Sequence, residues 1–216
     1  MISTGMTRLD NLLGGGIAAG IITDIFGPSG TGKTQIAMQI CVNSIKDGKI
    51  IYQDTTGSFR PERVLQIIKS KHLDEKLLDN ILVARVTNIA EQIEYINKVS
   101  EINPILLVID NITDLFSFEY SHESSSLEKH IQFMEYMHML GMLSVRKKIS
   151  IVITNTVRQS DESTRETLDK SISMFTHKKI RLAKSGRKFV ADVLPSFGDK
   201  KMVSYEITSE GVIESP

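Results

Sequence analysis

The residues with the clearest chemistry form a glycine-rich segment near the N-terminus. They match the pattern G-x-x-x-x-G-K-[ST] and are Gly27, Pro28, Ser29, Gly30, Thr31, Gly32, Lys33 and Thr34. Glycines let the backbone wrap a phosphate chain, and amides at a helix start supply hydrogen-bond donors and the positive end of a dipole. We expect all of these residues to bind a nucleotide. Lys33 is the expected catalytic residue, since its ammonium would reach the β- and γ-phosphates, and the Thr34 hydroxyl would hold Mg²⁺.

Asp110 carries the carboxylate that we expect to complete this site. It follows the apolar run from Ile105 to Ile109, in which every residue favours a β-strand buried on both faces. A carboxylate at the tip of a buried strand can anchor the Mg²⁺ shell, usually through water. The alternative is an aspartate that forms a turn and caps Asn111 and Ile112. The expected cofactors are ATP and Mg²⁺.

The segments that must position these residues alternate between short apolar runs and amphipathic stretches. This rhythm predicts an α/β fold with a mostly parallel central sheet flanked by helices. The expected strands are residues 21–26, 50–54, 81–86, 105–110 and 149–154, and the expected helices are residues 34–46, 61–71, a segment after Asn88, and residues 125–147. Gly48 is placed to end the first helix, Pro61 suits the first turn of the second, and Asn88 with Glu91 resembles a capping box.

Beyond the last of these strands the pattern changes. Residues 157–176 are polar and lose clear periodicity, which indicates a long loop or a poorly ordered helix, and segments of this kind are often functional. Residues 178–213 are expected to form short strands with turns at Ser185-Gly186 and Gly198-Asp199. We therefore expect a C-terminal antiparallel extension of the sheet.

Several further segments have recognisable sequences, and they extend over nearly the whole chain. They are Ser3-Thr4-Gly5, Leu9 to Ile17, the glycine-rich segment running into Thr34-Gln35, Asp54 to Arg63, and Ile151 to Asn155. Together these segments resemble the RecA/RadA recombinase superfamily, and most of all its short archaeal form. The resemblance implies a RecA-like P-loop ATPase core that binds ATP and Mg²⁺, with a role in homologous recombination and DNA repair. It also implies that Asn155 is at a nucleotide-sensing position.

The resemblance also predicts how the chain is organised. Full recombinases carry an N-terminal helical domain and a Phe-x-x-Ala linker that serves filament formation. The residues before Ile21 leave no room for either, so we expect residues 1–216 to form a single RecA-like ATPase core domain. By the same resemblance, Arg63 stacks on the adenine of the nucleotide, with a surface ion pair as the alternative.

Two positions depart from the family pattern, and both predict slow hydrolysis. Thr56 stands where the family places a glutamate that orients or activates the attacking water. Threonine cannot take a proton at neutral pH, and loss of a general base typically costs about 10²–10⁴-fold in rate. Thr156 replaces a glutamine that senses the γ-phosphate and couples it to a DNA-binding loop. Asp54 and Glu62 are the carboxylates nearest to Thr56 in the sequence, and the sequence leaves open whether either reaches the γ-phosphate.

The distribution of charge predicts where DNA would bind. In the family, two loops after the magnesium strand and the sensor strand hold single-stranded DNA. Here residues 116–130 have three glutamates against one lysine, besides two histidines, and residues 157–176 have three basic against four acidic residues, whereas phosphate backbones require a positive surface. Residues 178–201 instead have eight basic against two acidic residues. The expected DNA contacts are Lys178, Lys179, Arg181, Lys184, Arg187 and Lys188, and the alternative is an ordinary solvated hairpin face.

The overall composition limits the classes of function. Of 216 residues, 26 are Lys or Arg and 26 are Asp or Glu, so a nucleic-acid surface must be a local patch. The apolar runs are shorter than the ~18 residues that span a bilayer, and residues 1–10 are too polar for a signal peptide. The single cysteine, Cys41, excludes an intramolecular disulfide and fits a reducing compartment. We expect a cytoplasmic, nucleoid-associated protein without membrane contact.

The leading hypothesis is an ATP-binding accessory protein of recombination. It would bind DNA with modest affinity, preferring single strands, and assist a full-length RadA-type recombinase. It would hydrolyse ATP slowly. The sequence leaves open whether the protein forms a homo-oligomer. One alternative is a DNA-dependent ATPase that itself forms filaments and exchanges strands, against which Thr56, Thr156 and the missing N-terminal region argue. The other is a KaiC-like regulatory ATPase that does not act on DNA, against which the segment from Asp54 to Arg63 argues.

Overall fold

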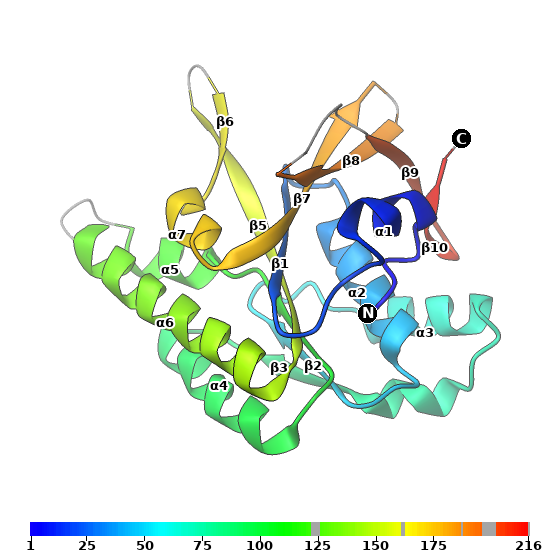
Figure 1. Ribbon diagram of the computed structural model, residues 1–216, viewed down its shortest axis with the longest axis horizontal. Coiled ribbons are helices and arrows are strands. Elements are labelled where there is room, and N and C mark those ends of the chain that lie inside the picture. The colour runs from blue at the N-terminus through cyan, green and yellow to red at the C-terminus, as the bar shows by residue number, and fades with distance from the viewer. Residues whose placement is uncertain (122–125, 161–162, 187, 196–201, 216) are drawn as a thin grey trace.

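The computed structural model describes residues 1–121, 126–160, 163–186, 188–195 and 202–215, which form a central sheet with helices on both faces (Figure 1). The strands are β1 (Ile22–Gly27), β2 (Ile50–Asp54), β3 (Ile81–Arg85), β4 (Leu106–Asp110), β5 (Ser150–Ser160), β6 (Ser163–Glu166), β7 (Thr176–Ser185), β8 (Lys188–Leu194), β9 (Val203–Thr208) and β10 (Gly211–Glu214). The α-helices are α1 (Thr7–Leu13), α2 (Lys33–Ser44), α3 (Pro61–Ser70), α4 (Ile89–Ile102), α5 (Asp114–Glu119), α6 (Ser126–Lys147) and α7 (Asp169–Ser173), and a 3-10 helix spans Glu75–Asn80. Among these described helices, none is both long and apolar enough to cross a membrane.

Four neighbouring parallel strands, β1, β5, β4 and β2, have their C-terminal ends at the same edge of the sheet. Across the described sheet the order is β10-β9-β8-β7-β1-β5-β4-β2-β3, with β6 paired to β5. Strands β7, β1, β5, β4, β2 and β3 are parallel, and β8, β9 and β10 continue the sheet by antiparallel pairing. The register aligns Asp54 with Asp110 and Gly27 with Thr156. The predicted fold, mostly parallel with antiparallel C-terminal strands, is confirmed.

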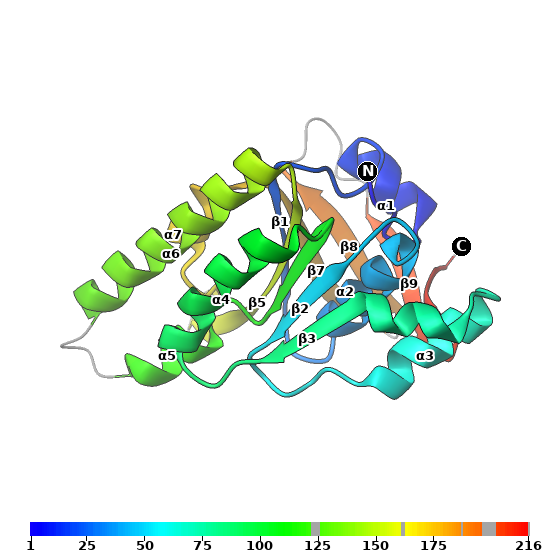
Figure 2. The ribbon, with the colours of Figure 1, turned by 90° about the horizontal axis from the view of Figure 1, so that it is seen from below.

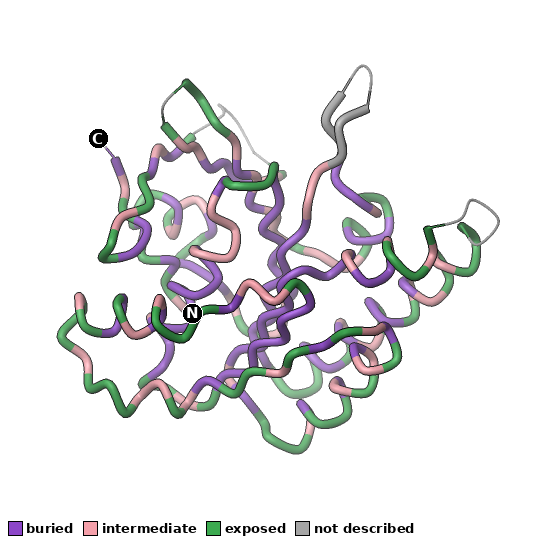
Figure 3. Tube along the Cα trace, turned by 180° about the vertical axis from the view of Figure 1, so that it is seen from behind, coloured by how far each residue is buried: buried purple, intermediate pink, exposed green. Residues whose placement is uncertain are grey.

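Two apolar cores lie on the two faces of the sheet. Leu106 and Val108 of β4 belong to the core beneath α1, α2 and α3, whereas Leu107 and Ile109 belong to the core beneath α4, α5 and α6. Figure 2 shows these two groups of helices on opposite sides of the sheet. In Figure 3 the buried trace runs through the central strands and the exposed residues lie on the outer helix surfaces. Burial on both faces explains why β4 is continuously apolar.

The segment after the last predicted strand is a correction to the sequence prediction. Residues 157–176 contain neither a long loop nor a poorly ordered helix in their described part. Strand β5 continues to Ser160 and pairs antiparallel with β6, with Val157 opposite Glu166, and α7 follows. Figure 1 shows β6 and the end of β5 standing clear of the helices. The pairing of β5 with β6 is made by backbone groups, which residues of any type supply, so the polar sequence gives no periodic signal of it.

The strand predicted at 149–154 is β5, which runs on to Ser160; the other strands and helices with predicted bounds begin and end within two residues of them, and the predicted cap of α4 is present. Asn88 Oδ1 accepts a hydrogen bond from Glu91 N at 2.9 Å, which caps α4, and Glu91 Oε2 accepts from Thr87 N at 3.0 Å. A turn at Ser185-Gly186 joins β7 to β8, with Gly186 at a left-handed φ of +62°. The turn predicted at Gly198-Asp199 lies outside the described residues.

Candidate nucleotide-binding site

The glycine-rich segment joins β1 to α2 and lines an open cavity of about 360 Å³. Glycine is needed at two of its positions. A Cβ at Gly27 would lie 2.3 Å from the carbonyl oxygen of Leu182 in β7, and Gly32, just before α2, has a left-handed φ of +92°. The described residues lining the cavity are Ser29, Gly30, Gly32, Lys33, Thr34, Thr56, Ser58, Asp110, Asn111, Asp114 and Thr156.

Lys33 lies at the start of α2 with its side chain folded against the loop. Its Nζ donates hydrogen bonds to the carbonyl oxygens of Gly27 at 2.8 Å and Pro28 at 2.9 Å. Burial lowers the pKa of Lys33, while the charges of Asp110 and Asp114 oppose that shift. The ammonium is therefore held beside the loop that would wrap a phosphate chain.

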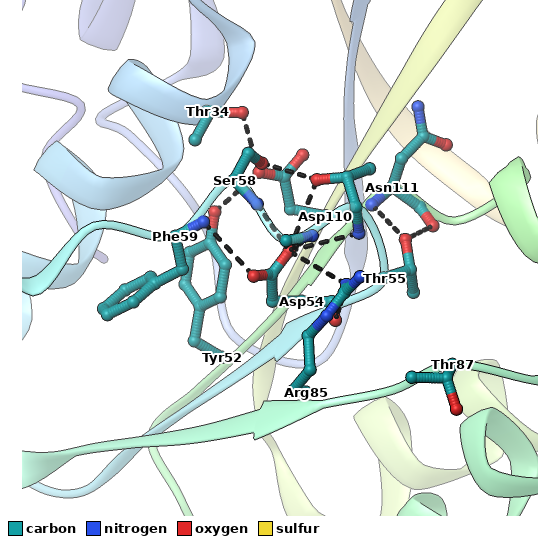
Figure 4. Close-up of polar contacts among 12 residues, drawn as sticks. Thr34, Tyr52, Asp54, Thr55, Ser58, Phe59, Arg85, Thr87, Asp110 and Asn111 are labelled. Carbon is teal, nitrogen blue, oxygen red and sulfur yellow. Dashed lines mark hydrogen bonds and ion pairs between the residues drawn. The ribbon is translucent and has the colours of Figure 1, made fainter.

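Asp110 is buried at the end of β4 and accepts hydrogen bonds from three hydroxyl groups. Thr34 Oγ1 and Tyr52 OH each donate to Oδ2 at 2.7 Å (Figure 4), and Thr154 Oγ1 donates to Oδ1. Burial and the charge of Asp110 raise the pKa of Tyr52, so its hydroxyl stays protonated and donating. A carboxylate and a hydroxyl oxygen brought together in this way fit Mg²⁺, which prefers hard oxygen ligands.

The carboxylate of Asp110 does not point to the turn that follows it. Ile112 N donates to the carbonyl oxygen of Thr154 at 3.0 Å, and the turn is capped by Asn111, whose Oδ1 accepts from Thr113 N at 2.9 Å. This arrangement favours the metal-anchoring interpretation of Asp110 over the capping one. Sequence reasoning missed Tyr52 and Thr154, because nothing in a buried strand marks which side chain faces the end of its neighbour.

Asp54 organises the loop that brings Thr56 to the cavity. Its Oδ1 accepts hydrogen bonds from the backbone N–H groups of Thr56, Gly57 and Ser58 at 3.1, 2.8 and 3.2 Å. Figure 4 shows this carboxylate turned into the loop beside Arg85, whose Nη1 lies 3.8 Å from Oδ1. Asp54 is therefore occupied as a loop anchor.

The two positions that depart from the family pattern both line the cavity. Thr56 reaches it from the loop after β2, and Thr156 from β5, in register with Gly27. Glu62 is exposed in the first turn of α3 and is not among the lining residues, whereas Asp114 at the start of α5 is. Sequence reasoning missed Asp114; its only signal was an acidic residue shortly after Asp110.

Arg63 joins α3 to the turn between β9 and β10. Its Nη1 and Nη2 donate to the carbonyl oxygens of Ser209 and Thr208 at 2.8 and 2.5 Å, and its Nε donates to Gln35 Oε1 at 2.7 Å. These acceptors are neutral oxygens rather than the carboxylate of a surface ion pair. The guanidinium is thereby held in place, and its stacking on adenine stays a prediction.

Two of the residues predicted to contact DNA are paired with carboxylates. Lys179 is only 12% exposed, and its Nζ contacts Glu166, Asp169 at 2.7 Å and Asp24 at 3.6 Å. Arg181 forms a bidentate pair with Asp192, with N···O distances of 3.0 and 2.7 Å. Their charges are therefore neutralised within the protein.

The other lysines predicted to contact DNA differ from one another in how far they are exposed. Lys184 and Lys188 are exposed on either side of the β7–β8 turn, and Lys178 is partly buried near the start of β7. Lys184 Nζ lies 5.8 Å from the ring centroid of Phe189. Arg187 lies outside the described residues. Two exposed lysines thus lie near the tip of the β7–β8 hairpin, on opposite faces of it, because Lys184 pairs with Phe189 and Lys188 with Ser185.

A chain of polar contacts runs from the nucleotide cavity to β6 and β7. Asn155 Oδ1 accepts from Thr113 Oγ1 at 2.7 Å, and Asn155 Nδ2 donates to Glu166 Oε1 at 2.8 Å. The other carboxylate oxygen of Glu166 contacts Lys179. Burial and the nearby charge of Glu166 raise the pKa of Asp24, whose oxygens have no hydrogen-bond partner in the described structure. Asn155 is thus linked through Thr113 to the nucleotide cavity and through Glu166 to the β5–β6 hairpin.

Comparison with known families identifies a match over nearly the whole chain. A family model described as Rad51 matches residues 1–213. This range includes the glycine-rich loop, Asp110 and the C-terminal strands.

Individual relatives are about one-third identical to this chain. RadA of Cenarchaeum symbiosum, a DNA repair and recombination protein, is 37% identical over 175 residues, which cover 76% of this chain and 44% of RadA. RadB of Pyrococcus furiosus, also a DNA repair and recombination protein, is 35% identical over 167 residues, covering 76% of this chain and 71% of RadB. The meiotic recombination protein DMC1 of Saccharomyces cerevisiae is 34% identical, covering 74% of this chain and 51% of DMC1. The chain thus spans about half the length of this RadA and of DMC1, and 71% of the length of this RadB.

Proposed function

Because this chain belongs to the Rad51 family, within the RecA/RadA recombinase superfamily and close to RadB, we propose that it binds ATP with Mg²⁺ and acts in homologous recombination and DNA repair. In this proposal it binds DNA with modest affinity and assists a full-length recombinase of the RadA type. The observation that carries nucleotide binding is the hydrogen bond of 2.7 Å between Thr34 Oγ1 and Asp110 Oδ2. It joins the two predicted magnesium ligands beside the glycine-rich loop.

Each part of the site has a separate task in this proposal. The loop amides and the N-terminus of α2 bind the phosphate oxygens. The Lys33 ammonium exchanges its two carbonyl partners for the β- and γ-phosphates, an attraction that partial burial strengthens. Thr34 and Asp110 hold the metal, and Mg²⁺ when bound neutralises charge on the phosphates.

ATP hydrolysis is proposed to be slow. Thr56 and Thr156 line the cavity, and neither hydroxyl can accept a proton at neutral pH. The test is ATP turnover by the wild type, Lys33→Ala and Thr56→Glu, with and without single-stranded DNA. We expect the wild type to exceed Lys33→Ala slightly and Thr56→Glu to be faster. Strong DNA-stimulated turnover by the wild type would contradict this and favour a protein that exchanges strands itself.

The proposed DNA surface is the β7–β8 hairpin with Lys178, Lys184 and Lys188. We leave Lys179 and Arg181 out of it because carboxylates neutralise their charges. Binding through a few phosphate contacts should weaken steadily with salt. Fluorescence anisotropy of single- and double-stranded oligonucleotides over a salt series tests this binding. Binding to DNA would also keep the protein at the nucleoid. Lack of any salt-dependent binding would favour a regulatory ATPase that does not act on DNA.

The proposed surface for the recombinase partner is strand β3. It is at the edge of the described sheet, and its Leu82 and Val83 are 39% and 45% exposed. An edge strand can pair with an extended segment of another protein through its backbone, while exposed apolar side chains contribute specificity. This surface lies on a different strand from the DNA surface, so both partners could bind together.

A further inference from the structure

We propose that Tyr205 is a positioning residue, which holds the glycine-rich loop in the shape that binds phosphate. The inference rests on the proposed function, because it concerns how this site binds ATP. Tyr205 belongs to β9 and is completely buried, and its hydroxyl donates a hydrogen bond to the carbonyl oxygen of Thr31 at 2.6 Å. It thereby joins the C-terminal part of the sheet to the loop.

This hydrogen bond fixes the peptide unit between Thr31 and Gly32. The unit is trans and planar, so its C=O and N–H groups point in opposite directions. Because the carbonyl oxygen of Thr31 faces Tyr205, the N–H of Gly32 points away from β9. Gly32 lines the cavity, whereas no residue of β9 is among the described lining residues. The N–H is therefore directed to the side where loop amides bind phosphate oxygens.

A second side chain of β9 supports the same part of the loop. A Cβ built on Gly32 would lie 2.7 Å from Cδ1 of Ile207, so Ile207 packs against the glycine where a side chain would be. Tyr205 and Ile207 are two residues apart in one strand and lie on the same face of it. Rotation of the peptide unit would turn the N–H of Gly32 away from the cavity, and both contacts oppose that rotation.

The ring of Tyr205 is itself held by its neighbours. It pairs across the sheet with Phe189 of β8, and the two rings are stacked with their centroids 5.6 Å apart. Burial raises the pKa of Tyr205, so its hydroxyl stays protonated and donating. The end of β9 is also tied to α2, because Arg63 donates to both Thr208 O and Gln35 Oε1. The protein itself thus fixes the position of the hydroxyl group.

The support from Tyr205 does not depend on Lys33. In the proposed function Lys33 Nζ leaves the carbonyl oxygens of Gly27 and Pro28 for the phosphates. Thr31 Oγ1 also donates to Pro28 O at 2.8 Å, and Thr31 O accepts from Tyr205. These two bonds can persist when Lys33 moves, so the loop keeps its shape. A preformed loop binds its ligand more tightly, because less free energy is lost in ordering it.

The binding test compares Tyr205→Phe with Tyr136→Phe. Tyr136 is equally buried on the other face of the sheet, where its hydroxyl donates to the neutral Oε1 of Gln53 at 3.1 Å, and it is not among the described lining residues. Calorimetry measures the affinity for ADP with Mg²⁺ and for tripolyphosphate, which has phosphates but no base. Thermal unfolding checks that both variants fold.

We expect Tyr205→Phe to weaken binding of both ligands at least about fivefold, the effect of one lost hydrogen bond, and Tyr136→Phe to change neither. Equal effects of the two variants would overturn the proposal, because the tyrosine hydroxyl would then contribute to folding alone. A loss for ADP without a loss for tripolyphosphate would also overturn it, since the effect would then concern the base and not the loop.

A spectroscopic measurement reports on the Gly32 N–H itself and begins with the wild type. An amide proton that donates to a charged phosphate oxygen forms a short, strong hydrogen bond and moves downfield in the ¹H–¹⁵N spectrum. We expect ADP to move the Gly32 amide proton downfield in the wild type and clearly less far in Tyr205→Phe. An unchanged Gly32 resonance in the ADP-bound wild type would overturn the proposal. Lower stability of a folded variant would not by itself alter this shift.

The proposed function and this inference fail in different ways. If the wild type binds neither ATP nor ADP, the proposed function fails and the inference fails with it. If the wild type binds ADP but Tyr205→Phe behaves like Tyr136→Phe, nucleotide binding stands and the positioning role of Tyr205 is refuted.

Discussion

At the scale of single residues, Asp110 shows how a buried carboxylate is kept ready for a metal. Burying a charge is costly unless hydrogen bonds compensate it, and here hydroxyl groups of Thr34, Tyr52 and Thr154 supply them. These donors come from α2, β2 and β5, so the carboxylate also ties three elements together. When Thr34 turns to a metal, the other two hydroxyls can continue to hold Asp110.

Replacement of Tyr52 by Phe tests this support. Hydrogen bonds to charged groups contribute about 1.5–3 kcal/mol, so we expect Tyr52→Phe to lower the free energy of unfolding by that amount. The matched control is Tyr205→Phe, since Tyr205 OH donates to the neutral carbonyl of Thr31 at 2.6 Å and should cost about 1 kcal/mol. Urea unfolding measures both. Equal losses would show that the charge of Asp110 is unimportant to the bond.

Asp24 should make stability depend on pH. Burial and the nearby Glu166 raise the pKa of Asp24 above its ordinary value of 3.8, with Lys179 facing the same group. The folded state therefore binds more protons than the unfolded state above pH 3.8, so the contribution of Asp24 to stability falls as pH rises. We expect Asp24→Asn to gain stability relative to the wild type as pH rises from 4 to 8.

Asp169 provides a control of opposite sign for that measurement. Burial alone would raise the pKa of Asp169, but hydrogen bonds from Lys179 and Ser173 lower it. Its contribution to stability is present above pH 3.8 and is lost at lower pH. Asp169→Asn should therefore lose stability relative to the wild type as pH rises through this region. Urea unfolding at several pH values decides whether the two trends oppose each other.

At the scale of elements, strand β7 separates structural from solvent-facing lysines. Lys179 lies between Glu166, Asp24 and Asp169, and it joins β7 to β1 and to the end of the β5–β6 hairpin. Lys184, further along the same strand, is exposed near the turn. The role of each lysine is therefore determined by whether carboxylates surround it or solvent does, since the residue type is the same.

Substitution of these two lysines by methionine should affect different properties, protein stability for Lys179 and DNA affinity for Lys184. Lys179→Met leaves buried carboxylates without their cation, and breaking such a pair costs about 3–5 kcal/mol, so a large loss of stability is expected. Lys184→Met should change stability by less than about 0.5 kcal/mol, since it is a surface substitution, and weaken DNA binding. Urea unfolding and oligonucleotide anisotropy measure the two effects. A stable Lys179→Met protein with impaired DNA binding would reverse these assignments.

At the scale of the whole molecule, the sheet keeps three surfaces apart. The nucleotide cavity lies where β1, β2, β4 and β5 end, the exposed lysines lie at the β7–β8 turn, and the exposed apolar residues of β3 lie at the edge strand. Figure 1 shows β3 and β8 separated by the central strands. A nucleotide-dependent effect on either partner would therefore have to pass through the sheet.

The partner surface can be tested by placing a charge on β3. Val83→Asp should reduce affinity for the RadA-type recombinase at least tenfold while leaving ATP affinity unchanged, because a charge disfavours apolar contact at an edge strand. Met174→Asp is the control, since Met174 is 71% exposed but lies just after α7. Surface plasmon resonance compares the two. Equal weakening by both variants would exclude β3 as the specific surface.

The sequence by itself determined most of the elements of the parallel sheet and predicted which residues would gather around the glycine-rich loop. Buried parallel strands such as β4 must be apolar on both faces, and a phosphate loop needs glycines at set positions, so both leave local patterns. The expectation that Thr34 and Asp110 serve one Mg²⁺ site follows from the same logic, because parallel strands end at one edge of a sheet.

Only the tertiary structure decided which charges are available. Lys179 and Lys184 belong to the same basic segment, yet one is buried among carboxylates and the other is exposed. Asp54 is likewise occupied by amides of its own loop, although the sequence places it among the carboxylates nearest to Thr56. Charge pairing joins residues that are distant along the chain, so its outcome depends on register and burial, which short sequence patterns do not contain.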